Sequence, residues 1–205
     1  MFISRKKMFE LLSGMVHHYS IVIYFLFSKI RVLYYKVNPF IMIDWSANIE
    51  KGAILSTHYG GNIIIGKNTH LYQRSFLCTY GGDIQIGHNC SINAEAVVYG
   101  LGGVKIGNNV LIAGQTMIVP GMHTFKEIEK PICKQPLTKQ GIVIEDDVWI
   151  GSGVKILDGV TVSRGCVIGA GAVVNKSTEP YGVYVGVPAK KIKSRVSLET
   201  NESFS

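Results

Sequence analysis

The chain carries an aliphatic residue at every sixth position over long stretches. Isoleucine, leucine or valine stands at positions 144, 150, 156, 162, 168 and 174 without a break. A period of six is too short for a helical solenoid and too regular for an ordinary sheet, so it predicts hexapeptide coils stacked into a parallel β-helix. We call the complete series the aliphatic ladder, and its earlier members are Ile43, Ile49, Leu55, Ile65, Leu71, Leu77, Ile86, Ile92, Val98, Ile106, Ile112 and Ile118.

The aliphatic ladder also predicts the cross-section of this all-β solenoid. Three ladder positions per turn make a triangular coil, and about six such coils cover residues 41–177. Residues two positions before a ladder member point to the same side of a strand. They are mostly small or β-branched, as at Ala47, Thr69 and Cys90, which suits a narrow interior. Glycine follows several ladder positions, as at Gly66 and Gly151, where a tight corner leaves no room for a side chain.

The regular coils are interrupted at one recurring place. Insertions follow Leu55, Leu77, Val98 and Ile118, each the third ladder position of its coil, so all four fall at the same corner. The first three are short turns that contain glycine, whereas the fourth is a long loop covering about residues 119–141. Insertions in solenoids commonly map to one face, which is often the binding face. We therefore expect a functional site beside the long loop.

Two segments flank the β-helix domain, which we assign to residues 41–195. Residues 1–40 are largely apolar and aromatic, but their longest apolar run, residues 21–27, is too short to span a bilayer. One interpretation is a helical extension that ends before Pro39 and packs on the end or side of the solenoid. The other is a basic, aromatic interfacial helix that holds the protein at the inner face of the plasma membrane. Residues 196–205 are polar, and we expect them to be disordered.

The net charge and the cysteines indicate which binding partners and which cellular compartment to expect. The formal charge is +7, with basic residues clustered at both ends of the chain and no nucleic-acid motif beside them. Phosphorylated small ligands or an anionic membrane are therefore expected partners, and nucleic acid is not. Neither the four cysteines nor the six histidines show metal-ligand spacing, so we expect no metal site. The cysteines are interpreted as reduced thiols of a cytoplasmic protein.

Three residues are candidates for chemistry. His123 begins the long loop, outside the core, where an imidazole could take a proton from a hydroxyl or amine near neutral pH. Trp149 precedes Ile150 of the aliphatic ladder, so strand alternation turns its indole outward, where a ligand or a neighbouring subunit would have to cover it. Asn93 follows Ile92 and also lies outside the core; it is either a functional residue or simply a corner residue, for which asparagine is well suited.

Several motifs together resemble those of one known family. They are His123 at the head of a loop after a coil, DVWIG at residues 147–151, IGAGAVV at residues 168–174 and GVPAK at residues 186–190. With the aliphatic ladder, they look like the left-handed β-helix (hexapeptide-repeat) acyltransferases, and most like the maltose/galactoside acetyltransferase branch with its capsule and lipopolysaccharide O-acetyltransferases. The resemblance covers about residues 41–195.

The resemblance implies a homotrimer with active sites between neighbouring subunits and acetyl-CoA as the donor substrate. His123 matches the catalytic base of the family, and Asn93 matches a position that contacts the acceptor or orients the site. Trp149 matches the tryptophan at the CoA cleft. Gly151, Ala170 and Lys176 match positions along the pantetheine and phosphate track, and Lys190 matches a basic residue near the nucleotide end of CoA.

The acceptor follows less directly from the motifs. The N-terminal segment does not look like that of the sugar acetyltransferases, which supplies part of their acceptor pocket. Gln135 lies in a run similar to that of the capsule and lipopolysaccharide enzymes, and could bind a sugar hydroxyl or organise the loop. We expect an acetyl-CoA-dependent O-acetyltransferase that modifies a sugar of a cell-surface polysaccharide. The alternatives are an antibiotic O-acetyltransferase of the streptogramin type and a non-catalytic β-helix binding module.

Overall fold

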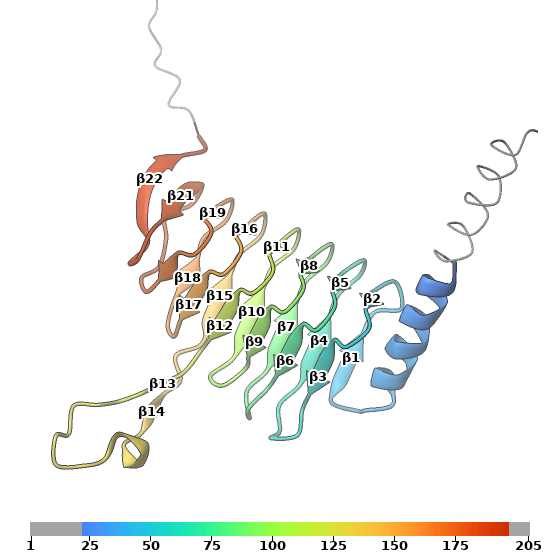
Figure 1. Ribbon diagram of the computed structural model, residues 1–205, viewed down its shortest axis with the longest axis horizontal. Coiled ribbons are helices and arrows are strands. Elements are labelled where there is room, and N and C mark those ends of the chain that lie inside the picture. The colour runs from blue at the N-terminus through green and yellow to red at the C-terminus, as the bar shows by residue number, and fades with distance from the viewer. Residues whose placement is uncertain (1–21, 197–205) are drawn as a thin grey trace, which may run out of the picture.

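The computed structural model describes residues 22–196, and its centre is a solenoid with three faces. Each face is a parallel sheet to which successive coils contribute one strand (Figure 1). The first sheet contains β1 (Ile41–Ile43), β4 (Ile63–Ile65), β7 (Ile84–Ile86), β10 (Val104–Ile106), β15 (Ile142–Ile144) and β18 (Thr161–Val162). The second contains β2 (Asn48–Ile49), β5 (His70–Leu71), β8 (Ser91–Ile92), β11 (Leu111–Ile112), β16 (Trp149–Ile150), β19 (Val167–Ile168), β21 (Gly182–Val185) and β22 (Lys190–Ser194). The third contains β3 (Ile54–Ser56), β6 (Phe76–Cys78), β9 (Val97–Tyr99), β12 (Met117–Val119), β17 (Lys155–Leu157) and β20 (Val173–Val174).

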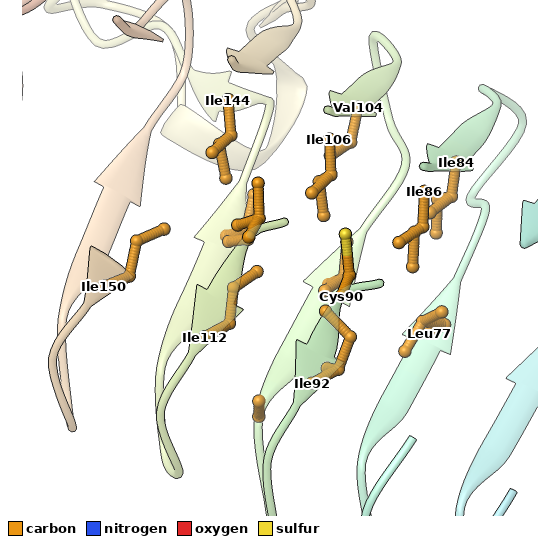
Figure 2. Packing of buried hydrophobic residues seen from close by; sticks show 14 of the residues in the cluster. Leu77, Ile84, Ile86, Cys90, Ile92, Val104, Ile106, Ile112, Ile144 and Ile150 are labelled. Atoms are coloured by element: carbon orange, nitrogen blue, oxygen red, sulfur yellow. The ribbon is translucent and has the colours of Figure 1, made fainter. Parts of the chain in front are cut away.

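The aliphatic ladder forms the core of this β-helix, as predicted. Every ladder side chain is at most 6% exposed. Equivalent ladder residues of successive coils stack on one another. Ile112, for example, pairs in register with Ile92 on one side and Ile150 on the other (Figure 2). The residues two positions before the ladder are buried as well. They are mostly small or β-branched on the second and third sheets, whereas the first sheet pairs two aliphatic residues, as at Ile84 and Ile86. The predicted solenoid fold is therefore confirmed.

The corners also follow the sequence pattern. We call the turn from first to second sheet the first corner, the turn from second to third the second corner, and the return from third to first the third corner. At the first corner, a Cβ atom on Gly87 would lie only 2.5 Å from the carbonyl oxygen of Gly107 in the next coil. Asn68, Asn89 and Asn109 stack there with positive φ of 55–57°, which asparagine tolerates well. The four insertions all lie at the third corner, between the third and first sheets, as predicted.

The long loop leaves the solenoid as a separate arm. It contains a short antiparallel ribbon of β13 (Met122–His123) and β14 (Leu137–Thr138), with a turn of 3-10 helix at Ile132–Lys134 between the two strands. Figure 1 shows this arm extending away from the coils between β12 and β15. The arm therefore carries most of its residues beyond the surface of its own β-helix.

An N-terminal helix, described over residues 22–36, covers the first coil of the solenoid, and it ends before Pro39 as predicted (Figure 1). Its side chains bind the free backbone edge of that coil. Lys29 Nζ donates to the carbonyls of Trp45 and Ala47 at 3.0 and 2.8 Å, and Ser28 Oγ accepts from the backbone N–H of Ile49 at 2.8 Å. Further contacts to coil carbonyls come from Arg31 to Ile49, Tyr35 to Ala53 and Lys36 to Ile43.

A titratable cluster fixes the start of this helix to the second sheet. The Tyr24 hydroxyl donates to Glu50 Oε1 at 2.6 Å, and His70 Nε2 lies 3.0 Å from the same oxygen. Burial lowers the pKa of His70 despite the opposing attraction of Glu50, and burial together with Glu50 raises the pKa of Tyr24. The Glu50 carboxylate therefore joins the helix to the solenoid through its contacts with Tyr24 and His70.

The opposite side of the helix is apolar and faces outward. Ser28 and Val32 are fully buried against the coil, while the exposed side chains include Val22, Ile23, Phe25, Leu26, Phe27, Ile30, Leu33 and Tyr34. The usual arrangement of a surface helix, with its apolar side on the core, is thus reversed. None of the helices within residues 22–196 has the length and hydrophobicity needed to cross a membrane. Residues 1–21, and the tail expected to be disordered beyond Val196, lie outside the described part of the chain.

Candidate active site

His123 is held at the base of the long arm. It is the second residue of β13, it pairs with Leu137 of β14, and its side chain is exposed at the third corner. Within residues 22–196 its imidazole makes no hydrogen bond to another side chain. Glu127, a carboxylate close to it in the chain, pairs instead with Lys130, whose Nζ lies 3.8 Å from Glu127 Oε1. A histidine in this position is accessible to a substrate.

His123 forms one end of an aromatic groove of about 400 Å³ at the third corner. Tyr59 and Tyr80 of the first two insertions and Tyr99, the last residue of β9, form a row that we call the tyrosine stack. The remaining lining residues are Leu101, Val119, Pro120, Gly121 and Leu137. The sequence analysis missed this groove. Its signal was a Tyr-Gly pair that recurs in the three turns at residues 59, 80 and 99, one coil apart.

Gln135 holds the arm in shape. Its side chain is almost fully buried, and its amide nitrogen donates to the carbonyl oxygens of Glu127 and Lys130, both at 2.8 Å. Its amide oxygen accepts from the backbone N–H of Glu127 at 3.2 Å. Of the two roles expected for Gln135, the loop-organising one is thus present in the structure, and contact with a sugar hydroxyl stays a prediction.

Four of the predicted site residues lie along the second sheet or the corner that follows it. Trp149 points outward from β16 with 54% of its surface exposed, between Leu111 and Val167 of the adjacent strands. Asn93 follows β8, and its amide nitrogen donates to the carbonyl of Ile112 at 3.0 Å. Gly151 lies directly below Ala170 of the next coil, where an added Cβ would come within 2.6 Å of the Ala170 nitrogen.

Lys176 and Lys190 lie apart from these four residues. Lys176 follows β20 of the third sheet, so it belongs to the third corner, as His123 does. Lys190 begins β22 and is exposed opposite Val185 of β21. Its neighbour Lys191 is 2.5 Å from Glu179, and this contact raises the pKa of Lys191. Lys190 has no carboxylate partner among residues 22–196, so its ammonium is free for an anionic ligand.

The structure therefore divides the predicted site between two edges of one β-helix. His123 and Lys176 lie at the third corner, and Asn93, Gly151 and Ala170 lie at the second, with the width of the third sheet between the two. Residues on different edges of one triangular solenoid face away from each other. A site that uses both groups would have to form between two copies of the chain. Among residues 22–196, no cluster of three or more His, Cys, Asp or Glu side chains could hold a metal ion.

Comparison with known sequence families gives two matches within the solenoid. Residues 141–176 match the family described as bacterial transferase hexapeptide (six repeats), and residues 83–115 match the hexapeptide repeat of succinyl-transferase. A probable acetyltransferase of Mycobacterium tuberculosis is 32% identical over 167 residues, which are 80% of this chain and 56% of that protein. The chain spans about half the length of the first curated relatives that it matches.

Solved structures of acyltransferases also resemble this chain. A maltose O-acetyltransferase from Clostridium difficile superimposes with a TM-score of 0.56 and 32% identity, over 63% of this chain and 67% of that one. An N-acyltransferase from Bacillus cereus, solved with dTDP-4-amino-4,6-dideoxyglucose and coenzyme A, superimposes with a TM-score of 0.68 over 79% of this chain and 87% of that one. Its identity of 24% establishes a common fold only.

Proposed function

The chain belongs to the hexapeptide-repeat acetyltransferase family, and from that membership we propose that it transfers an acetyl group from acetyl-CoA to a sugar hydroxyl. The observation that carries the proposal is the exposed His123, which has no side-chain partner among residues 22–196 and lies at the end of a groove beside the arm. In the proposed reaction His123 removes the hydroxyl proton as the oxygen attacks the thioester carbon. The carbon–sulfur bond then breaks, and the proton passes from the imidazolium to the leaving CoA thiolate.

The donor side of the proposal uses the coils that follow the arm. The exposed indole of Trp149 offers an apolar surface to the pantetheine chain, and Gly151, which packs closely against Ala170 of the next coil, carries no side chain that would obstruct it. Lys176 and Lys190 are exposed and can meet the CoA phosphates as point charges. The similarity to the probable acetyltransferase of M. tuberculosis and to the maltose O-acetyltransferase of C. difficile supports an acetyl donor.

The acceptor side of the proposal is a hydroxyl of a sugar in a cell-surface polysaccharide. The maltose O-acetyltransferase of C. difficile supports a sugar acceptor and transfer to oxygen. We further propose that the active protein is a homotrimer with each site between two subunits, because His123 and Asn93 lie on different edges of one chain. In such an assembly the third corner of one subunit faces the second corner of its neighbour.

Calorimetric titration with acetyl-CoA tests the proposed donor without knowledge of the acceptor. We expect saturable binding near one site per chain, weakened about tenfold in Trp149→Ala, because the indole would lose its apolar contact with the ligand. Trp45→Ala is the matched control, since Trp45 is equally exposed but lies in the first coil, far along the solenoid from β16. A folded protein that does not bind acetyl-CoA would contradict the proposed function.

We also propose that the apolar side of the N-terminal helix rests on a phospholipid membrane. The basic side chains of this helix are bound to coil carbonyls, so that mainly apolar and aromatic groups remain on the outside. Such a surface suits the headgroup boundary of a bilayer, and Arg5, Lys6 and Lys7 precede it in the sequence. With its free cysteines, the protein would then work at the cytoplasmic face of the plasma membrane.

Replacing Leu26 and Leu33 by aspartate should reduce binding to anionic phospholipid vesicles at least about tenfold, because two apolar contacts become charged groups at the interface. Flotation of vesicles with bound protein measures the effect. Ile128→Asp is the control, since Ile128 is 93% exposed but lies on the arm. If the doubly substituted protein floats as well as the wild type, the helix is not a membrane contact.

A further inference from the structure

The tyrosine stack is a continuous aromatic surface that leads to His123. The rings of Tyr59 and Tyr80 stack with centroids 5.1 Å apart and an interplanar angle of 17°, and the ring of Tyr99 meets Tyr80 edge to face at 5.0 Å. Each ring comes from a different coil at or beside the third corner, so the row runs along the axis of the solenoid. The same groove contains His123 of the next insertion.

The order of the coils separates a donor side from an acceptor side. All five residues proposed to contact CoA, from Trp149 to Lys190, lie in coils after the arm. Tyr59, Tyr80 and Tyr99 lie in coils before it, and His123 is at the boundary. A molecule that reaches His123 along the tyrosine stack would therefore approach from the side opposite to the donor.

The chemistry of the groove favours a neutral ligand with apolar faces and hydroxyl groups. Its lining contains no Asp, Glu, Lys or Arg, so neither a phosphate nor a charged chain would find an ion-pair partner there. Tyrosine combines an apolar ring with a polar hydroxyl, so it can contact the C–H face of a sugar and also exchange hydrogen bonds with it. Desolvation and the neighbouring Cys78, Tyr99 and Tyr59 raise the pKa of Tyr80, so its hydroxyl keeps its proton.

The length of the row sets the size of the ligand. Neighbouring coils of a parallel β-helix are spaced by about 4.8 Å, the distance between strands, so Tyr59 and Tyr99 are about 10 Å apart along the axis, and Tyr59 is about 14 Å from the level of His123. A single sugar ring at His123 could not reach Tyr59. A chain of several sugar units could contact all three rings.

We infer that the tyrosine stack binds an oligosaccharide or polysaccharide acceptor along the third corner, with one sugar unit at His123 and preceding units on Tyr99, Tyr80 and Tyr59. This inference rests on the proposed function, which it deepens by assigning the surface on which several sugar units of the acceptor bind. The acceptor strand lies parallel to the solenoid axis. The enzyme therefore acts on sugar units within or at the end of an assembled glycan.

Tyr59 offers the sharpest test, because its side chain is 61% exposed and lies furthest from His123. The probe is a panel of neutral oligosaccharides of one to six units in several linkages, with binding measured by saturation-transfer NMR and calorimetry. We expect affinity to rise with chain length, and Tyr59→Ala to weaken binding of the longer members about tenfold while leaving single sugars unchanged. Tyr34→Ala is the matched control, because Tyr34 is also exposed, at 72%, but lies on the N-terminal helix.

Two other outcomes would overturn the inference. If neutral oligosaccharides do not bind, or bind equally well to Tyr59→Ala, the tyrosine stack only stabilises its own turns or packs against a second copy of the chain. The thermal melting of each variant separates a loss of folding from a loss of binding. Titration of the same proteins with acetyl-CoA distinguishes failure of this inference from failure of the proposed function. If acetyl-CoA binds but Tyr59→Ala does not change oligosaccharide binding, only the acceptor surface is contradicted.

Discussion

Replacing His123 with alanine should lower the rate of acetyl transfer by about 10²-fold to 10⁴-fold, the usual contribution of a positioned general base. Without the imidazole, the acceptor hydroxyl would have to attack the thioester with its proton in place. The core lies elsewhere, so the variant should fold normally and bind acetyl-CoA with unchanged affinity. The measurement is acceptor-dependent release of CoA thiol, with donor binding followed separately by calorimetry.

Two further variants give this result its meaning. His123→Gln keeps a hydrogen-bonding side chain of similar length but cannot act as a base at neutral pH, so it should be nearly as inactive as alanine. His88→Ala removes an exposed histidine of the first corner, and its activity should match the wild type. Near-normal transfer by His123→Ala would exclude the proposed mechanism.

The division of the site between two edges allows a test of the proposed trimer with the same assay. If each site takes His123 from one subunit and Asn93 from its neighbour, His123→Ala and Asn93→Ala chains should each be weak alone. Trimers reassembled from a mixture of the two should recover part of the activity, because some interfaces then contain both intact residues. A mixture that stays as inactive as its components would place the whole site within a single chain.

Replacing Ile112 with alanine should lower the free energy of unfolding by about 2–5 kcal/mol, the cost of deleting a large aliphatic side chain from a rigid core. Ile112 is 0% exposed and is stacked between Ile92 and Ile150, so the cavity opens in the middle of the solenoid. Coils of a solenoid bury their interior only by contact with their neighbours, so a defect in a central coil weakens two interfaces at once.

Leu111→Ala is the matched control for this core substitution. It removes the same number of carbon atoms from the preceding residue of the same strand, but Leu111 is 49% exposed on the outer face of the second sheet. Its cost should be below about 1 kcal/mol. Denaturant unfolding at one fixed protein concentration measures both, since assembly would make stability depend on concentration. Equal losses for the two variants would contradict the assignment of Ile112 to the core.

The sequence predicted the β-helix closely because its fold depends on a repeated local rule. The same pattern recurs in coil after coil: a large aliphatic residue such as Ile150, a smaller partner such as Val148 two positions earlier, and a corner glycine. The contacts between coils therefore involve the same residue types that form each single coil. Counting the insertions located the third corner and the arm correctly. His123 could be found because it stands where this regular pattern stops.

The remaining features arise from contacts that the six-residue period does not describe. Tyr59 and Tyr80 lie in insertions, which a search for periodicity treats as gaps, and Tyr99 is an outward residue at the end of β9. Only stacking of the coils brings the three rings together. The buried amide of Gln135 depends on how the arm folds back on itself. The N-terminal helix packs on the end of the solenoid, as one interpretation of its sequence predicted. Its other side is apolar and exposed, and contact of this side with a membrane stays a prediction.

The hydrogen bonds from the N-terminal helix to the first coil also bear on the solubility of the whole molecule. A stack of parallel strands ends in unpaired backbone groups, and such an edge can pair with strands of another molecule and grow into a fibre. Here Lys29, Arg31, Tyr35 and Lys36 occupy carbonyls of that edge, and Ser28 occupies one of its N–H groups. We therefore expect the helix to block end-to-end polymerisation, and a chain that lacks the helix to expose a template for aggregation.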